Sequence, residues 1–230
     1  MRWFMTLIVA LAAGFAGAAL WDVSGLGDRS TRDYLLAHPE VLPEAMEVLQ
    51  RRDQQARIDP LRRELETPFP GAVLGNPAGS VTLVEFSDYA CTYCRQSLAD
   101  VEALVAANPD LKVVIREYPI LSPQSLEAAR MALAAAEQGR YAQFHTAMFR
   151  MSPPSSESIE AAAREAGVDL ARARAAIETG AFDDQLRSNG QLAAELGVSG
   201  TPAWVIGDQA LNGAVGREAL EEAIEEARQS

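Results

Sequence analysis

The sequence predicts an α/β fold with an all-helical insertion and a short N-terminal helical segment. Two apolar runs of strand character, residues 81–86 and 111–116, flank a stretch from 91 to 107 whose apolar residues recur at helical spacing. An Ala-rich, helix-patterned stretch follows at about 122–198, and a second pair of short strand-like runs comes after it. Strands and helices in this order indicate a sheet covered by helices.

Residues 1–21 have the pattern of an export segment. Arg2 is the single charge, and the nineteen residues from 3 to 21 carry none. One interpretation is a cleaved signal peptide, with Ala16-Gly17-Ala18 as the small-residue cleavage site. The other is an uncleaved membrane anchor, because a span needs about 20 apolar residues. Either way we expect a periplasmic protein, in an oxidising compartment where thiol pairs exchange disulfides.

Residues 22–68 are predicted to form a separate helical segment. Leu42, Met46 and Leu49 recur at helical spacing, and Asp59-Pro60 breaks this helix and starts another. Such a short amphipathic piece has no core of its own, so it must pack on the main domain or on another chain. We therefore expect an oligomerisation segment that forms a dimer or a trimer. The alternative is a solvated linker helix.

The domain at residues 69–230 is expected to hold the sheet and the insertion. The insertion is predicted to contain helices at 126–136, 141–151, 156–166, 170–177 and 183–196. A hairpin of residues 202–206 and 209–211 turns around Gly207-Asp208. A final helix then covers residues 218–228.

The chain has two cysteines, Cys91 and Cys94, which form a C-x-x-C pair directly after the predicted strand 81–86. A structural disulfide usually closes a longer loop, where it constrains the unfolded chain more. A zinc site needs four ligands, and His38 and His145 have no spacing that would complete one. A redox pair is therefore favoured, and C-x-x-C between a strand and a helix is the thioredoxin layout.

The position of Cys91 suits a nucleophile. The thiolate attacks a disulfide, and free backbone N–H groups at a helix N-terminus favour that anion. Cys94 lies one turn later on the same face, close enough to form a disulfide with Cys91. Glu85 precedes Cys91 by six residues inside the apolar strand, where a carboxylate is costly unless neutral or paired. We interpret Glu85 as a buried proton acceptor for Cys94; the alternative is a glutamate facing water at a sheet edge.

Three segments resemble the DsbA-like thioredoxin proteins. Residues 84–94 resemble their active-site strand and helix, residues 127–145 resemble their helical insertion, and residues 197–202 resemble their cis-proline loop. The resemblance covers about residues 70–230 and implies a thioredoxin fold with a helical insertion.

The resemblance also implies roles for seven residues. Cys91 would be the nucleophile, Cys94 the resolving thiol and Glu85 the buried acid. The residues implied to bind substrate are Thr92, Tyr93, Thr201 and Pro202. The Thr201–Pro202 peptide is expected to be cis, and no cofactor is expected because the electrons travel through cysteines alone.

A narrower resemblance concerns residues 31–49, which are similar to the N-terminal segment of ScsC-type (suppressor of copper sensitivity) and Com1-like proteins. In that group the segment can mediate oligomerisation. The oxidase DsbA has a histidine between its cysteines and a valine before the loop proline, whereas this chain has Thr92-Tyr93 and Thr201. These residues are similar to those of disulfide isomerases, so an isomerase or reductase is favoured. A DsbA-like dithiol oxidase and a copper-binding protein that uses the cysteine pair are the alternatives.

Charge and the remaining candidate ligands narrow the choice of partners. The net charge of −12 excludes a basic nucleic-acid surface, so no nucleic acid is expected. The expected partners are proteins with thiols or disulfides, a membrane redox partner, and copies of the same chain joined through residues 22–68. His145 lies among apolar residues of a predicted helix and is interpreted as structural, as are Met131, Met148 and Met151.

Overall fold

The computed structural model describes residues 2–23, 26–151 and 153–229, and the chain divides into two compact units. The first is Met1–Arg52 and the second is Asp53–Ser230. The helices that begin in the first unit are α1 (Arg2–Val23), α2 (Leu26–Ala37) and α3 (Val41–Ile58). Among the described residues, no helix is both long and apolar enough to cross a membrane.

The second unit contains the predicted sheet and helices. Its elements are α4 (Arg62–Glu66), β1 (Val73–Gly75), β2 (Val81–Ser87), α5 (Thr92–Ala107), β3 (Leu111–Glu117), α6 (Pro123–Ala136), α7 (Tyr141–Met151), α8 (Ser156–Glu165), α9 (Leu170–Glu178), α10 (Asp183–Leu196), β4 (Ala203–Ile206), β5 (Gln209–Asn212) and α11 (Arg217–Ala227). The predicted helices and strands are confirmed with small differences at their ends. The strand β1 was not expected, because three residues are too few to carry a periodic pattern.

The five strands form one mixed sheet in the order β1-β3-β2-β4-β5. The strands β2 and β3 are parallel, which the helix α5 between them makes possible, and the other pairs are antiparallel. In the parallel pair, Glu85 lies opposite Ile115 and Ser87 opposite Glu117. The β2–α5–β3 unit followed by the β4–β5 hairpin and α11 confirms the α/β prediction and its thioredoxin layout.

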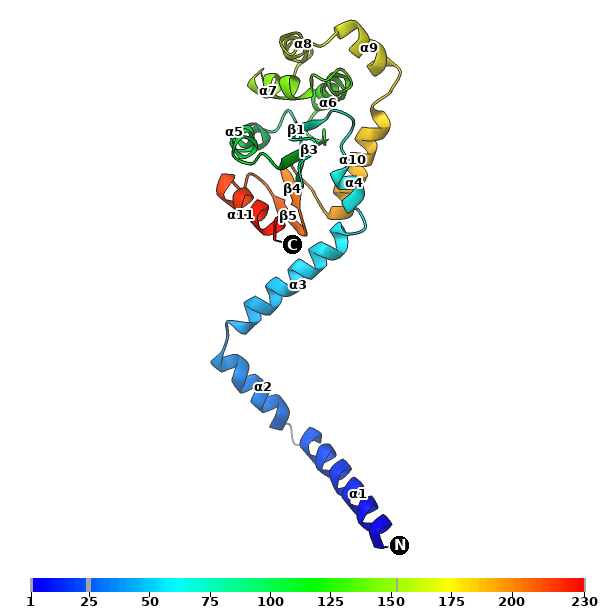
Figure 1. Ribbon diagram of the computed structural model, residues 1–230, viewed down its shortest axis with the longest axis vertical. Coiled ribbons are helices and arrows are strands. Elements are labelled where there is room, and N and C mark those ends of the chain that lie inside the picture. Colours follow the sequence, from blue (N-terminus) through cyan, green and yellow to red (C-terminus); the bar gives the residue numbers. More distant parts are fainter. Residues whose placement is uncertain (1, 24–25, 152, 230) are drawn as a thin grey trace. The chain divides into compact units, whose positions relative to one another are not determined.

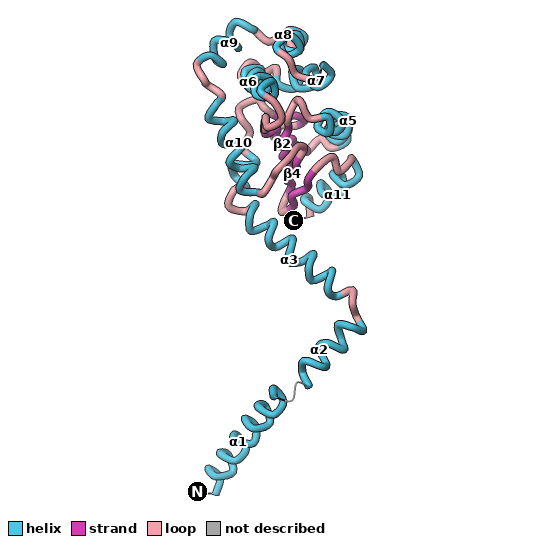
Figure 2. The backbone as a smooth tube through the Cα atoms, turned by 180° about the vertical axis from the view of Figure 1, so that it is seen from behind, coloured by secondary structure: helices cyan, strands magenta, loops and turns pink. Residues whose placement is uncertain are grey.

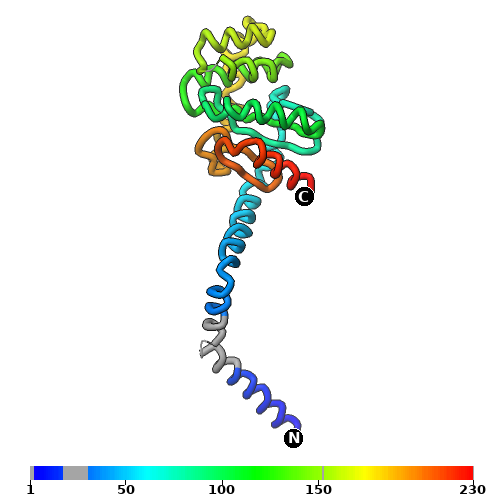
Figure 3. Tube along the Cα trace, turned by 90° about the vertical axis from the view of Figure 1, so that its left-hand side faces the viewer, coloured from blue at the N-terminus to red at the C-terminus, as the bar shows by residue number. Residues whose placement is uncertain are grey.

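Helices cover both faces of the sheet (Figure 1). One face, which includes Leu83 and Val113, packs against α5, α11 and the insertion helices α6 to α9. The opposite face, which includes Val84 and Val114, packs against α4 and α10. The reverse view places α10 and α5 on opposite sides of the strands as well (Figure 2). Within the second unit the insertion helices gather at one end and α11 lies at the other (Figure 3).

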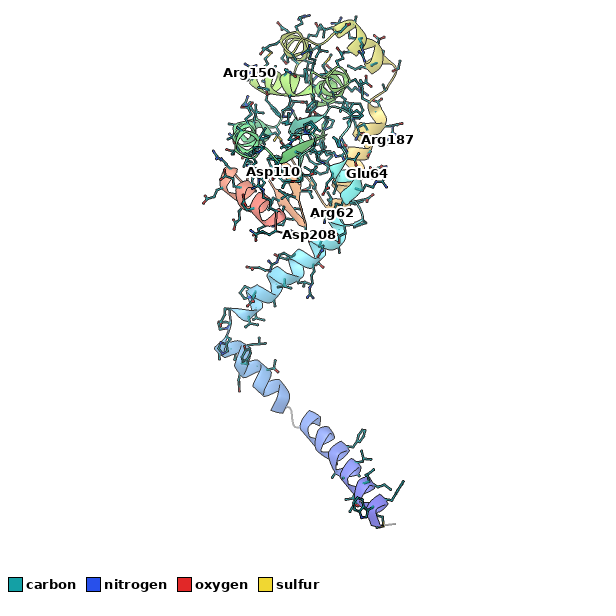
Figure 4. The ribbon with its side chains drawn as sticks, viewed as in Figure 1. Arg62, Glu64, Asp110, Arg150, Arg187 and Asp208 are labelled. Carbon is teal, nitrogen blue, oxygen red and sulfur yellow. The ribbon has the colours of Figure 1, made fainter. Side chains whose placement is uncertain are left out.

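Residues 53–66 belong to the second unit. Ile58 and Leu65 are completely buried in the core between the sheet and α10. On the surface of the same unit, the Arg62 guanidinium donates to the Gly207 carbonyl oxygen at 2.8 Å and to Asp208 Oδ1 at 2.5 Å. Figure 4 labels Arg62 and Asp208 next to each other on this surface. The last turn of α3 and all of α4 are therefore part of the thioredoxin-like core.

Arg116 fixes the chain where α4 ends. The side chain is buried, and its guanidinium donates to the carbonyl oxygens of Leu65 at 2.9 Å and Thr67 at 2.6 Å. These carbonyls lie at the C-terminal end of α4, where a cation is favourable. Burial lowers the pKa of Arg116 to about 10, so it stays charged at neutral pH.

In the first unit, α2 and α3 carry apolar side chains that face solvent. The large exposed ones on these helices, within the described residues, are Tyr34, Leu36, Leu42, Met46 and Leu49. Isolated exposed apolar residues are ordinary, but these side chains recur on successive helical turns and form an exposed apolar surface.

Candidate active site

The helix α5 places the two cysteines together. Cys91 is the N-cap residue of α5 in extended conformation, so α5 begins one residue later than the sequence predicted. The Cys94 N–H donates to Cys91 Sγ at 3.4 Å, which brings a backbone dipole onto the first sulfur. Both thiols are free, and Cys91 is the more accessible, with 5% of its surface exposed against 1% for Cys94.

The loop after α10 lies against Cys91. Gly197 ends α10 with a φ of 74°, a left-handed conformation that glycine adopts without strain, and the chain then turns toward Pro202. The Thr201–Pro202 peptide is cis, as expected. Cys91 Sγ donates to the Thr201 carbonyl oxygen at 3.2 Å, and the Gly213 N–H donates to the Pro202 carbonyl at 2.8 Å. The loop is thus held between the nucleophile position and the end of β5.

Glu85 is buried below the cysteines. It lies on the central strand β2, and its 2% exposure excludes the alternative of a glutamate facing water at an edge. Burial raises the pKa of Glu85 to about 7. Burial also raises the pKa of the Cys94 thiol, and the Glu85 carboxylate raises it further. A thiol that resists ionisation thus lies beside a group that takes up a proton near neutral pH.

Asp88 is a site residue that the sequence reasoning missed. Its Oδ1 accepts the Ala90 N–H at 2.8 Å, and its Oδ2 accepts the N–H groups of Ile120 at 2.8 Å and Leu121 at 2.9 Å. Its carbonyl oxygen accepts the Cys91 N–H at 2.9 Å. One buried carboxylate thus ties the loop before Cys91 to the segment after β3. The available signal was an aspartate three residues before Cys91, because aspartate is a common turn former.

Exposed apolar side chains lie in the C-x-x-C turn and in the segment that Asp88 holds. Tyr93, Ile120 and Leu121 are the large exposed hydrophobic residues among the described residues of the second unit. Tyr93 belongs to the C-x-x-C turn beside the exposed Thr92, and the other two are the residues that Asp88 holds. Ile120 and Leu121 were not predicted as site residues, because nothing in the sequence places them near Cys91.

Other candidate ligands do not assemble into a metal site. Among the described residues, no group of three or more His, Cys, Asp or Glu side chains is placed to hold a metal ion. His145, Met131 and Met148 are buried in the core, as the structural interpretation predicted. His38 is exposed and pairs with Glu40 at 3.2 Å.

Two family models match the chain. The DSBA-like thioredoxin domain covers residues 82–225, more than half of the sequence. The chain belongs to the DsbA-like thioredoxin domain family. The copper resistance protein ScsC N-terminal domain matches residues 31–56, which confirms the narrower resemblance of the N-terminal segment. The second unit therefore contains the DsbA-like thioredoxin domain.

Solved structures of similar proteins agree with this assignment. A thioredoxin-like oxidoreductase from Silicibacter pomeroyi is 42% identical, with a TM-score of 0.65 over 69% of this chain and 92% of that one. A periplasmic thioredoxin-like protein from Salmonella enterica is 30% identical, with a TM-score of 0.64 over 74% and 97%. Proteus mirabilis ScsC in a compact conformation is 28% identical, with a TM-score of 0.66 over 85% and 94%.

Curated relatives match over only part of their length. The Na(+)/H(+) antiporter NhaA 3 of Salinispora tropica is 28% identical over 155 residues, which are 66% of this chain and 24% of the antiporter. The chain thus spans about a quarter of the length of these relatives.

Proposed function

We propose that this protein is an extracytoplasmic thiol–disulfide exchange enzyme that acts on protein substrates, with disulfide isomerisation or reduction as its main activity. The observation that carries the proposal is the position of Cys91 Sγ, which contacts both the N–H of Cys94 and the carbonyl of Thr201. This sulfur lies at a helix N-terminus, beside its partner thiol and against a cis-proline loop.

The first step is attack by the Cys91 thiolate on a substrate disulfide. The Cys91 sulfur forms a bond to one substrate sulfur, the substrate S–S bond breaks, and the leaving thiolate takes a proton. In isomerisation another substrate thiol attacks the mixed disulfide and releases Cys91 as a thiolate, so the enzyme ends as it began. No cofactor takes part, because both electrons stay on sulfur.

In reduction Cys94 resolves the mixed disulfide. The Cys94 thiol transfers its proton to the Glu85 carboxylate, and the resulting thiolate attacks Cys91 Sγ. The bond between Cys91 and the substrate breaks, and the substrate sulfur leaves as a thiolate that takes a proton from water. The substrate disulfide is then reduced and the enzyme pair is oxidised. The pKa of about 7 supports this role for Glu85, because such a carboxyl is partly ionised at neutral pH and binds a proton more tightly than a free glutamate does.

Substrate binding is assigned to the surfaces on both sides of Cys91. An extended substrate strand pairs with the backbone at Thr201, and Pro202 lets that loop approach the cysteine closely. Thr92 and Tyr93 contact the substrate from the helix side. Thr201 before the proline and tyrosine in the dipeptide resemble the isomerases, which supports isomerisation over strong oxidation.

Ribonuclease refolding separates isomerase from oxidase. The reduced enzyme should restore the activity of scrambled ribonuclease. The oxidised enzyme should form disulfides in reduced ribonuclease more slowly than a DsbA-like oxidase would. A protein that oxidises reduced ribonuclease rapidly and leaves scrambled ribonuclease inactive is the alternative, a DsbA-like oxidase. Cys91→Ser provides the blank in both assays.

We further propose that residues 22–68 make the enzyme a homo-oligomer, a trimer or a dimer. The exposed apolar side chains of α2 and α3 and the ScsC N-terminal match at residues 31–56 support this. Several active sites on one particle can hold a misfolded substrate while its bonds are exchanged. Crowding of the sites also hinders a membrane oxidase, so a membrane reductant can keep the pair reduced.

The structure defines the truncation that tests oligomerisation. A chain that starts at Pro70 would lose Ile58 and Leu65 from the core, whereas one that starts at Asp53 keeps both. Light scattering should give an oligomer for a chain from Asp22 and a monomer for the chain from Asp53. The monomer should keep dithiol reductase activity and lose most isomerase activity. Monomers in both cases would refute the oligomer, and a fully active monomeric isomerase would refute its role.

The proposed location is the periplasm. The apolar export pattern of residues 1–21 supports it, as does the likeness to a periplasmic thioredoxin-like protein. Fractionation of cells that express the full chain, with mass spectrometry of its N-terminus, tests both the location and the cleavage near Ala16-Gly17-Ala18.

A further inference from the structure

Four buried polar side chains lie beside the cysteine pair and have no part in the exchange steps above. Tyr89, Glu117, Tyr141 and His145 are each at most 2% exposed. The hydroxyls of Tyr89 and Tyr141 donate to the same atom, Glu117 Oε1, at 3.0 Å and 2.7 Å. The hydroxyl oxygen of Tyr89 also lies 3.0 Å from His145 Nδ1. We call these four residues the tyrosine–glutamate cluster.

Glu117 is the shared acceptor of the cluster, because both tyrosine hydroxyls donate to it. Burial raises the pKa of Glu117 to about 8 and lowers the pKa of His145 to about 3, so the imidazole is neutral at pH 7. The neutral His145 ring lies within hydrogen-bond distance of the Tyr89 hydroxyl.

The cluster joins three parts of the fold. Tyr89 belongs to the loop between β2 and α5, two residues before Cys91. Glu117 is the last residue of β3, and its neighbour in the sheet is Ser87, at the start of that loop. Tyr141 and His145 lie on the first two turns of α7, in the insertion. A single carboxylate oxygen thus connects the loop that carries Cys91 to the insertion.

We propose that Glu117 is a positioning residue for Cys91, which acts through Tyr89 to hold the cysteine loop in register with the insertion. The proposal deepens the exchange function and rests on it. Apolar packing against Phe144 and Phe149 places the Tyr89 ring. The hydrogen bond to Glu117 holds its hydroxyl end, and with it the loop from which Cys91 Sγ reaches the Thr201 carbonyl.

The two tyrosines provide a matched pair of variants. Tyr89→Phe and Tyr141→Phe each remove one hydroxyl donor from the same oxygen of Glu117 and keep the ring in the core. Only Tyr89 is in the cysteine loop. If the cluster merely stabilises the core, both variants should lower the unfolding midpoint. The rates of disulfide exchange by the two folded variants should then be the same. If Glu117 positions Cys91 through Tyr89, their exchange rates should differ.

The test measures exchange by the full-length folded protein. For Tyr89→Phe we expect kcat for insulin reduction to fall about tenfold and the equilibrium constant with glutathione to shift, because small displacements of a reacting atom are costly. Tyr141→Phe should stay several-fold closer to wild type in both measurements. Equal rates in the two variants at matched folded fractions would overturn the proposal, whether both fall or neither does.

Two further variants keep the outcome interpretable. Glu117→Gln retains an acceptor oxygen and should lose less activity than Glu117→Leu, which removes the acceptor; the reverse order would also overturn the proposal. Should Glu117→Leu not fold, the tyrosine pair decides alone. Cys91→Ser monitors the underlying function: an active Cys91→Ser refutes the exchange mechanism itself, whereas an inactive Cys91→Ser with a wild-type Tyr89→Phe refutes only the positioning role.

Discussion

The buried carboxyl of Glu85 predicts that part of the stability of the folded protein depends on pH. Burial raises the pKa of Glu85 from 4.5 to about 7, so the folded protein binds this proton more tightly than the unfolded chain does. The contribution of the neutral carboxyl is therefore fully present below pH 4.5 and is lost as the pH rises through 7. At about 1.4 kcal/mol for each pH unit the total loss is about 3 kcal/mol.

Glu85→Gln removes this titration and keeps the size of the side chain. Between pH 5 and pH 8 the wild type should lose about 2.5 kcal/mol more unfolding free energy than the variant does, which is most of the total. Any constant cost of burying the amide is the same at each pH and cancels from this comparison. The unfolding free energy of the variant, relative to that of the wild type, is therefore expected to increase steadily as the pH rises.

The assay is urea unfolding of the reduced protein at pH 5, 6, 7 and 8, followed by the fluorescence of buried Trp204 and by circular dichroism. Glu222→Gln removes an exposed carboxyl from α11 and should follow the wild type at every pH. Parallel stability curves for wild type and Glu85→Gln would refute the reasoning, because they would mean that Glu85 is ionised in the folded protein at pH 5 as well.

Three other predictions concern the site. Cys94→Ser should accumulate mixed disulfides with substrate, visible by non-reducing electrophoresis, whereas Cys91→Ser should form none; trapping by Cys91→Ser alone would reverse their roles. Thr201→Val should lower the ratio of isomerase to oxidase activity, because the oxidase DsbA has a valine before its loop proline; an unchanged ratio would contradict this. Asp88→Ala leaves three backbone N–H groups unpaired and should lower the unfolding free energy by roughly 3 kcal/mol in urea titration; a loss below about 1 kcal/mol would mean that water replaces the carboxylate.

The C-x-x-C pair and its place between a strand and a helix were predictable because their signals are local. The spacing of Cys91 and Cys94, a strand before them and a helix after them lie within about thirty residues, where periodicity and capping act on neighbours. Glu85 was predictable for the same reason, since a charge inside an apolar strand is unusual wherever that strand ends up. The cis-proline loop came from the resemblance of residues 197–202, not from any pattern that composition or periodicity supplies.

Contacts between distant residues were decided by the tertiary structure. The strand β1 is stable because it pairs with β3, about forty residues later in the chain, and its own three residues carry no periodicity. Asp88 accepts a hydrogen bond from Ile120, which lies 32 positions later in the chain. Tyr89 contacts His145, which lies 56 positions later. Such pairings follow from the register of β2 beside β3 and from how the insertion packs, which no local propensity encodes.

The sequence by itself therefore determined the fold class, the cysteine pair at the start of α5 and the buried glutamate of β2, because each depends on the chemistry of a short segment. The tertiary structure decided which side chains hold those groups in place. It joined Glu117 to Tyr89 and Tyr141 through one oxygen, and it placed Ile58 and Leu65 inside the thioredoxin-like core. Burial is the physical reason for the hydrogen-bond partners. A polar group that is removed from water must form a hydrogen bond, and its partner is the residue that tertiary packing brings within reach.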